Sequence, residues 1–361
     1  MCCFVLAVIT SASTSWGWGT KEHILLTRLA VMRIVDDPAA PPALKNWLKS
    51  VTPDLTTRDA ERQFFLTAKL GAAPAGLVGL SHWVIVPDLI ANKDKKTLVQ
   101  PFGLPERLLH FIDLEYVNRT PETRAYKHDL SSIPKLDSVP RDFKDARYKE
   151  AGVLPFAVEM SYQNLVKAIK LGKLGAPVDL NDADTALRWA GYLSHYVQDN
   201  TQPHHATQDY KSAAYFANKR SAPNVHSQIE WKMNDDEKND FPQLRADYWD
   251  ALMKALESAK DPATSDDVWT ATLEVSTYSY RQLPLIGMAA MHAAGQKGTA
   301  EKPVGDAGAF DTEKFFRYES DVSGIKNGIK QSVLDMKANQ QAIAVLRTEK
   351  MLRRAWDEAT K

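Results

Sequence analysis

The sequence predicts an all-α protein built as a single multi-helix domain. Apolar residues recur at helical spacing along most of the chain, and no run alternates apolar and polar residues as a half-buried strand would. No break in composition marks a second domain, and no internal repeat is present. With 361 residues, 44% of them apolar and 25% charged, the chain is long enough to bury one large core.

The chain opens with a segment typical of the end of a secretory signal peptide. Residues 4–12 read Phe-Val-Leu-Ala-Val-Ile-Thr-Ser-Ala, and small residues follow as far as Ser15. The opening Met-Cys-Cys lacks the usual positive residues, so the start codon could lie upstream; a short buried strand is the alternative interpretation. We predict a leader over residues 1–17 and a secreted or periplasmic protein, because the apolar run is too short to span a bilayer.

The predicted helices follow the leader in order. Apolar spacing predicts them over His23–Val35, Leu154–Leu171, Asp247–Ala259 and Ile329–Thr360. The more apolar stretch Ser276–Ala294 contains Pro284 and Gly287, which predicts either a kinked buried helix or two short ones. Residues 119–152 and 293–311 are rich in polar residues, Pro or Gly, and we expect loop insertions there.

Charge and cysteine content restrict the chemistry. The formal net charge is zero, so no overall basic surplus indicates a nucleic-acid or anionic-membrane partner. Both cysteines, Cys2 and Cys3, fall within the predicted leader. A mature chain would therefore hold any metal through nitrogen and oxygen donors alone.

Histidine and carboxylate residues are concentrated between residues 195 and 230. His195 and Asp199 are four residues apart, as are His226 and Glu230. On a helix, residues at this spacing share one face and can bind one ion, and both residue types are good zinc ligands. We also expect Gly191, one turn before His195, to leave room beside a ligand.

The helix that carries His195 has recognisable ends. Asn181-Asp-Ala-Asp184 is a good N-terminal signal, and apolar residues follow at helical spacing. Pro203 stops the helix and turns the chain, so His205 can approach the same place from another direction. The neighbouring His204 is expected to be polar surface, with support of a ligand as the alternative.

Further candidate ligands occur earlier in the chain. They are Trp16 and Trp18 with His23, then Asp88, and then His110 with Asp113. Five of the nine histidines therefore occupy candidate ligand positions.

Together these residues resemble a known superfamily, the bacterial zinc-dependent phospholipases C and the fungal and plant single-strand-specific zinc nucleases. Its pattern is an N-terminal Trp, an early His, an Asp and a further His, then His-x-x-x-Asp-x-x-Gln-Pro-x-His and His-x-x-x-Glu/Asp. Residues 16–235 contain every element in that order. The resemblance implies an all-α catalytic domain of the zinc phospholipase C / zinc nuclease type over residues 18–361.

The resemblance also implies three zinc ions. His110, His195 and Asp199 would bind one, with Asp88 as a further ligand or as the group that holds its water. Asp88 would also orient the attacking water or accept its proton, which makes it the predicted catalytic residue. Phe111 and Asp113 are predicted substrate contacts, with ordinary packing and a salt bridge as the alternatives.

The other two ions would be bound on either side of this one. His205, His226 and Glu230 would bind the second. The third would use His23, a bridging Asp199, and the free amine and carbonyl of the mature N-terminal residue. We prefer Trp18 for that residue over Trp16, because the spacing from Trp18 to His23 is the nuclease type.

The implied activity is that of a secreted trinuclear-zinc phosphodiesterase, because clustered zinc ions suit phosphoester hydrolysis. Glu230, Tyr196 and Ala206 resemble the phospholipases, which makes phospholipid the preferred substrate. The spacing from Trp18 to His23 and the long gap between His205 and the next ligand resemble the nucleases, so single-stranded nucleic acid is the alternative. A non-catalytic zinc-binding protein is the third interpretation. No stable protein partner is implied, and a monomer is expected.

Overall fold

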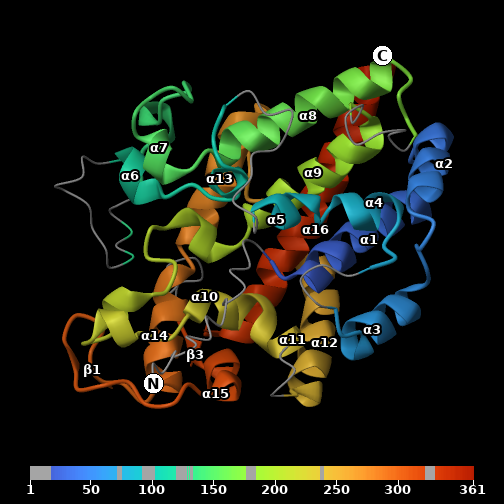
Figure 1. Cartoon of the computed structure of the whole chain (residues 1–361). Helices are drawn as coiled ribbons and strands as arrows, with labels where there is room; N and C mark the ends of the chain where they lie inside the picture. Colours follow the sequence, from blue (N-terminus) through green and yellow to red (C-terminus); the bar gives the residue numbers. More distant parts are fainter. Residues whose placement is uncertain are drawn as a thin grey trace, which may run out of the picture.

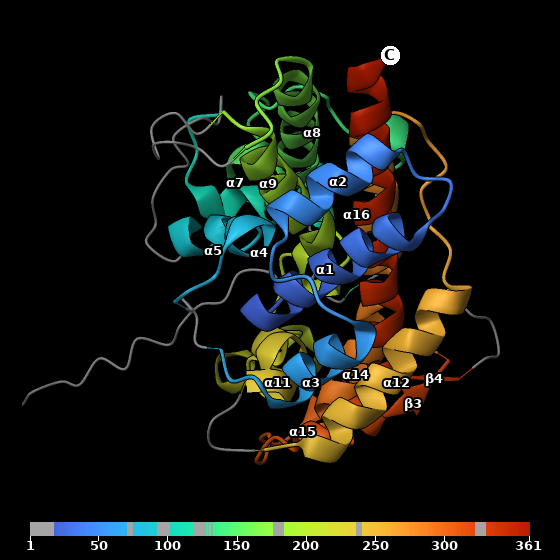
Figure 2. The ribbon, with the colours of Figure 1, turned by 90° about the vertical axis from the view of Figure 1, so that its right-hand side faces the viewer.

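The long C-terminal helix α16 (Val333–Thr360) organises the fold. Ser332 caps its first turn by accepting the Asp335 N–H, and the Asp335 carboxylate accepts the Ser332 N–H in return. Figures 1 and 2 show α16 passing through the middle of the molecule. The helices that pack against it most closely are α1 (Thr20–Asp36), α8 (Leu154–Lys170), α9 (Ala186–Asp199) and α12 (Pro242–Ser258).

The computed structural model describes residues 18–70, 75–91, 102–118, 128, 130, 133–175, 184–235, 240–321 and 330–361. The remaining α-helices are α2 (Pro42–Val51), α3 (Arg58–Thr67), α4 (Gly79–Trp83), α5 (Val86–Ala91), α6 (Leu114–Asn118), α7 (Tyr148–Ala151), α10 (Val225–Ser227), α11 (Met233–Asp235), α13 (Val268–Tyr280), α14 (Leu283–Ala293) and α15 (Thr312–Arg317). Short 3₁₀ turns are η1 (Glu106–Leu109), η4 (Leu136–Ser138), η5 (Pro203–Ala206), η6 (Ala213–Tyr215) and η7 (Lys219–Ser221), and η8 (Gln228–Lys232) is a π-helical turn.

Strands make a minor contribution. Strand β1 (Lys297–Gly298) pairs antiparallel with β2 (Pro303–Val304), with Lys297 opposite Val304. Strand β3 (Glu319–Ser320) pairs antiparallel with β4 (Gln331–Ser332), with Glu319 opposite Ser332. The β1–β2 hairpin lies inside the predicted 293–311 insertion. The predicted 119–152 insertion contains η4 and α7, and part of it falls outside the described residues.

The described apolar side chains form one main cluster that runs from Trp18 to Trp356, with two small satellites. The predicted all-α class is confirmed, and a single continuous core is what a single domain would have. None of the described helices is long and apolar enough to cross a membrane.

The stretch predicted as one kinked helix or two short ones is divided between two helices. α13 ends at Tyr280 and α14 begins at Leu283, so α13 starts well before the predicted boundary at Ser276. Pro284 lies in the first turn of α14, where its missing N–H has no helical partner to lose. Gly287 permits close packing, because a Cβ there would lie 2.2 Å from the Tyr215 ring.

Candidate metal centre

Helix α9 is the element that places the most important ligands. It begins after Thr185, whose hydroxyl caps the Arg188 N–H, and it is buried along its whole length. Residues 181–183 of the predicted start signal lie outside the described residues. The helix ends at Asp199 and Pro203 opens the following turn, η5, as predicted.

Gly191 has a different role from the predicted one. A Cβ at this position would lie 2.5 Å from the Trp83 Cβ and 2.6 Å from its carbonyl carbon. The glycine therefore makes room for the α4 backbone, and the prediction that it leaves room beside a ligand is wrong. This close approach matters because Val84, the next residue, holds His195 in place.

The first set of candidate ligands is the His110 group, defined as His110, His195 and Asp199. The Asp199 Oδ2 atom lies 2.9 Å from His110 Nδ1 and 3.1 Å from His195 Nε2. The two imidazole nitrogens are themselves 3.0 Å apart. The structure brings together the residues that the sequence assigned to one ion, from η1's C-terminal end and from α9.

A second set, the His23 group, consists of His23, Asp88 and His195. Its imidazoles stack with their ring centres 4.1 Å apart, and His23 Nε2 lies 3.4 Å from Asp199 Oδ1. Asp88 Oδ1 is 3.7 Å from both His195 Nε2 and His110 Nδ1, so this carboxylate faces both groups. The predicted placement of Asp88 beside His110 is therefore met, and it also lies beside the His23 group.

Trp18 anchors the chain just before His23. Its buried indole N–H lies 3.0 Å from the Gln198 carbonyl and 3.1 Å from the Thr201 hydroxyl, so the residue is fixed next to the end of α9. Trp18 is the first residue that the structure describes. The leader and Trp16 lie outside the described residues, and the role of the Trp18 amine stays a prediction.

The third set, the His226 group, consists of His205, His226 and Glu230. His226 Nε2 contacts Glu230 Oε1 directly, and His205 Nε2 lies 3.6 Å from the same oxygen. Gln202 donates its amide N–H to Glu230 Oε1 over 3.0 Å and accepts the His204 N–H over 2.6 Å. The chain passes from α10 into a π-helical turn between the two ligands, a distortion that often accompanies functional sites.

Three of the imidazoles have their tautomers set by the surrounding protein. In each, Nδ1 lies at hydrogen-bond distance from a protein oxygen, which leaves Nε2 with its lone pair directed into the centre. The oxygen partners, each 2.7 Å away, are the Gln198 side chain for His23, the Val84 carbonyl for His195 and the His110 carbonyl for His205. This support is typical of imidazoles that bind metals.

The centre also contains buried polar atoms that lack a hydrogen bond. Five such atoms make no hydrogen bond to any described residue: His23 Nε2, Asp88 Oδ1, His110 Nε2, Asp199 Oδ1 and Glu230 Oε2. Buried polar atoms are nearly always satisfied in proteins, so a cluster of exceptions needs an explanation. Several of them face candidate ligand sets, and the residues present therefore fit one or more metal ions. Nitrogen and carboxylate donors without thiolate suit zinc.

Burial controls the protonation of these groups. It lowers the pKa of His110 to about 4 and that of His226 to about 3, so both imidazoles are neutral near pH 7 and can donate a lone pair. Burial also raises the pKa of Glu230 to about 7 and the pKa of Asp88 well above its usual range. Burial alone would raise the pKa of Asp199 as well, but His195 and the hydrogen bonds around it hold that pKa well below the usual value.

His204 is buried rather than exposed, so the prediction that it is polar surface is wrong. Its Nε2 atom lies 3.1 Å from the Ser212 hydroxyl, and its ring stacks on His226 with the centres 5.6 Å apart. The backbone turn at Pro203 directs it inward beside His205. The alternative interpretation, support of a ligand, fits this position.

The two predicted substrate contacts lie on the segment that follows His110. Phe111 is half-buried and packs closely on Gly152, where a Cβ would lie 2.3 Å from the Phe111 carbonyl oxygen. Asp113 is buried, and its N–H donates to the Ala151 carbonyl over 2.7 Å. Their contact with a substrate stays a prediction.

Sequence reasoning missed several residues that support the centre. Gln198 and Gln202 lie inside the recognised motif but had no assigned role. Glu22 and Lys337 are also fully buried and form an ion pair. Because the two residues are far apart in the sequence, no local pattern could predict this pair.

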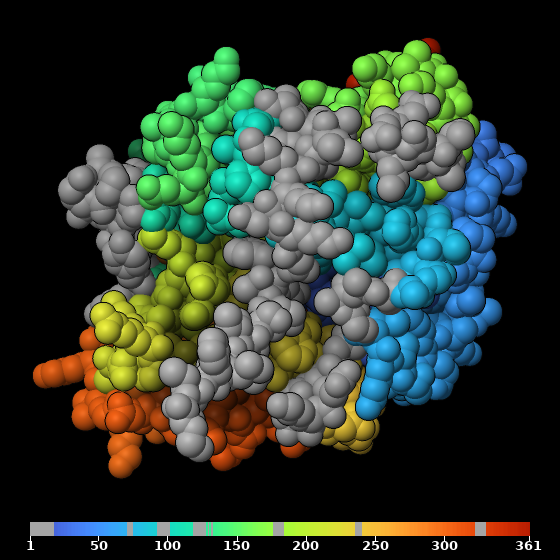
Figure 3. Space-filling view, in the orientation of Figure 1, coloured from blue at the N-terminus to red at the C-terminus, as the bar shows by residue number. Residues whose placement is uncertain are grey.

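Segments that contain or follow candidate ligands in the sequence reach the surface on one face of the molecule (Figure 3). The teal residues of α4 and α5 and the yellow-green residues that follow η5 are exposed on the same side (Figure 3).

A scan against protein-family models finds no match, and a search of curated proteins finds no similar protein. Membership of the zinc phospholipase C / zinc nuclease superfamily therefore stays a prediction from the motif.

Proposed function

We propose that the protein is a zinc-dependent phosphoric ester hydrolase with three metal ions. The observation that carries the proposal is that the three candidate ligand sets adjoin one another. His195 belongs to two of them, and Asp199 lies within 3.4 Å of His23, His110 and His195. His205 Nδ1, in the third set, lies 4.0 Å from Asp199 Oδ1. Neighbouring metal sites of this kind are typical of enzymes that cleave phosphoesters.

Together the residues of these sets would hold three ions, with His195 serving only the first. The His110 group would bind one ion with Asp88 nearby, and the His226 group would bind another. His23 and Asp199 would bind the third, together with the amine and carbonyl of Trp18 once the leader is removed. The proposal therefore includes secretion and processing, because an uncleaved chain has no free amine at that position.

The chain's own residues supply the positioning chemistry. Bound zinc ions would neutralise phosphate charge and lower the pKa of a bound water. Asp88 is buried and faces both the His110 and the His23 groups, so it is placed to orient the attacking water or accept its proton. Burial of His110 and His226 keeps them neutral, which leaves them free to bind rather than repel cations.

We prefer a phospholipid as the substrate, as in the phospholipases C. The support is Glu230 as the last ligand, together with Tyr196 and Ala206 beside two other ligands. The latter two residues are buried, so they indicate family likeness rather than contact with a substrate.

A second candidate, cleavage of single-stranded nucleic acid, is favoured by the segment between His205 and His226. Lys211, Lys219 and Arg220 lie in it, and Lys211 Nζ lies 5.5 Å from the centre of the Tyr210 ring. Tyr210 is 46% exposed, with its ring 5.9 Å from that of His226. An exposed aromatic ring can stack a base, and neighbouring cations can neutralise phosphates.

Two assays test the proposal. Mature protein is incubated with phosphatidylcholine vesicles and with single-stranded DNA, before and after removal of metal by a chelator. We expect hydrolysis of one substrate class, loss of activity on chelation, and recovery with added zinc. Zinc-loaded protein that cleaves neither substrate would contradict the enzyme proposal and favour a non-catalytic zinc-binding protein.

A further inference from the structure

A buried ion pair joins the beginning of α1 to α16 behind the candidate metal centre. Glu22 and Lys337 are both completely buried, and the Lys337 Nζ atom lies 2.7 Å from Glu22 Oε1. Glu22 immediately precedes His23, one of the candidate ligands. The pair thus lies one residue away from the His23 group.

The same lysine reaches a second group of ligands. Lys337 Nζ donates to the Ile229 carbonyl over 2.5 Å, and Ile229 immediately precedes Glu230. Three aromatic rings enclose the ammonium, with centres 5.5–5.6 Å from Nζ, and they belong to Trp18, Tyr248 and Phe316. One ammonium therefore contacts the residues that immediately precede two candidate ligands, His23 and Glu230.

Glu22 completes the connection through its other contacts. Its Oε2 atom accepts the Gly19 N–H over 3.1 Å, and its Oε1 atom accepts from the Asn234 side chain over 2.7 Å. A Cβ at Gly19 would lie 3.3 Å from the Glu230 carbonyl oxygen, so the start of α1 lies against the turn that carries Glu230. Helix α1 and the π-helical turn are held together at this point.

Stability alone is a poor reason for such a pair. The cost of removing two charges from water offsets most of their attraction, and apolar residues of similar size often stabilise a core equally well. A buried pair does fix the relative positions of the two segments it joins, because its hydrogen bonds are satisfied in one arrangement only. Metal ligands need that accuracy, since their distances must be correct to about 0.2 Å.

We propose that the Glu22–Lys337 pair is a positioning device that fixes His23 and Glu230 relative to each other so that both can bind metal. Neither residue touches metal or substrate. The inference rests on the proposed function, because it requires that the His23 and His226 groups bind zinc.

The test compares zinc affinity in two double variants. The first, Glu22→Gln with Lys337→Met, removes both charges at nearly constant volume and leaves no charge buried alone. The matched control is Asp261→Asn with Arg347→Met, which removes another ion pair of α16: Arg347 on this helix is 2% exposed and lies 2.8 Å from Asp261, in the segment between α12 and α13. Affinity is measured by competition with a chromophoric chelator, and ligand geometry by the absorption spectrum of the cobalt-substituted protein.

We expect the first double variant to fold and to bind zinc about 10–100-fold more weakly, with an altered cobalt spectrum, as for other residues that support metal ligands. The control should keep the wild-type affinity and spectrum. If the first double variant does not fold, Glu22→Asp alone serves instead, since it keeps both charges but shortens the side chain that connects α1 to Lys337, and it should also weaken zinc binding.

Two results would overturn the inference while leaving the proposed function intact. One is equal zinc affinity in the wild type and the Glu22/Lys337 variant. The other is an equal loss in the control, which would make the effect a general consequence of weakening α16. A wild-type protein that binds no zinc would overturn the proposed function and this inference together.

Discussion

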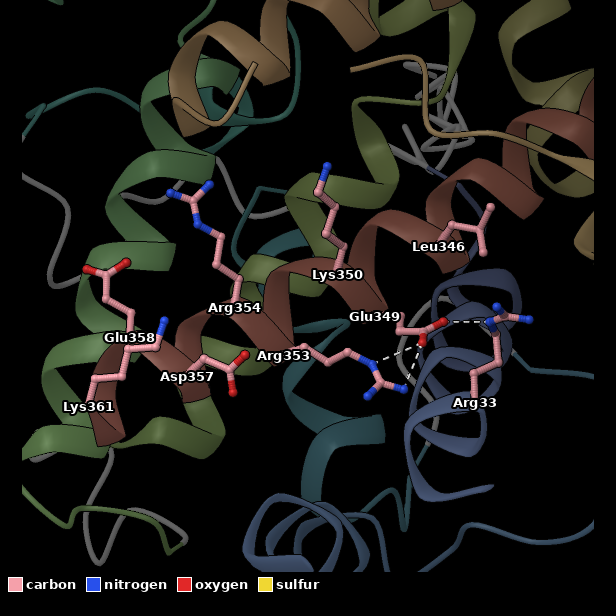
Figure 4. A pocket seen from close by; sticks show the side chains of 9 residues that line it. All are labelled: Arg33, Leu346, Glu349, Lys350, Arg353, Arg354, Asp357, Glu358 and Lys361. Atoms are coloured by element: carbon pink, nitrogen blue, oxygen red, sulfur yellow. Dashed lines mark hydrogen bonds and ion pairs between the residues drawn. The ribbon is translucent and has the colours of Figure 1, made fainter. Parts of the chain in front are cut away.

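Two regions of the molecule gather charged side chains, and they satisfy them in opposite ways. At the C-terminal end of α16, a cleft of about 810 Å³ is lined almost entirely by charged residues (Figure 4). Glu349 there lies 2.6 Å from Arg33 on α1 and 3.0 Å from Arg353, and Arg353 also lies 2.9 Å from Asp37. These charges are partly exposed and neutralise one another.

The candidate metal centre differs from this cleft in burial and in hydrogen bonding. Its groups are buried, and several of their polar atoms make no hydrogen bond to any described residue. Arg33 follows His23 on the same helix and lies about 15 Å further along its axis, given the helical rise per residue. The comparison teaches that a high density of charge does not identify a site, whereas a cluster of buried imidazoles and carboxylates whose ligand atoms lack hydrogen bonds points to one.

The largest effect should come from Asp199→Asn, which removes the carboxylate at the middle of the candidate metal centre. Because Asp199 faces three histidines, we expect zinc content to fall to about one ion per chain and activity to be lost with it. Elemental analysis and the substrate assays measure both. Full zinc content in this variant would show that Asp199 is not a shared ligand.

A leader that stays attached should be the next most damaging change. We predict that secreted protein begins at Trp18, or as a second choice at Trp16, and that the free amine is a ligand. Protein with residues preceding both tryptophans should hold about two zinc ions and show little activity. N-terminal sequencing identifies the start, and full activity with an extended N-terminus would contradict the amine ligand.

Asp88→Asn separates catalysis from metal binding within the centre. The amide keeps the shape of the side chain but cannot accept a proton. We expect the rate to fall on the order of 10²–10⁴-fold while most of the zinc remains bound. A near-normal rate would transfer the water-activating role to another acid close to His110, beginning with Asp113.

Gly191→Ala tests the close packing of α4 against α9, next to His195. An alanine Cβ would lie 2.5 Å from the Trp83 Cβ, so we expect overpacking to lower the free energy of unfolding by about 1–3 kcal/mol. Urea denaturation measures the change. An unchanged or increased stability would mean that α4 can move away from α9 without cost.

The smallest effect should come from the charged cleft. Glu349→Gln removes the acid that pairs with Arg33 and Arg353, but these side chains are partly exposed and screened by water. We expect a loss of only about 0.2–1 kcal/mol and unchanged zinc content. A loss of zinc in this variant would break the comparison between the two regions.

Much of the site was predictable because its ligands come in short-range pairs. His195 with Asp199 and His226 with Glu230 are each one helical turn apart, so local spacing already places them together. The inward turn of His204 was missed, because it depends on the geometry after Pro203. Gly191 was misassigned, since its constraint comes from Trp83, which is distant in sequence.

The fold was predictable to a similar extent. Helical periodicity located α1, α8, α12 and α16 to within a few residues at most ends. The Glu22–Lys337 pair could not be foreseen, because its partners meet only after the two ends of the chain have packed together.

The most direct test of the central claim is the metal content of the mature protein. Protein purified without chelators, with its N-terminus determined, is analysed for zinc and other metals by elemental analysis. The three adjoining ligand sets predict close to three zinc ions per chain. One zinc ion or none after gentle purification would contradict the cluster.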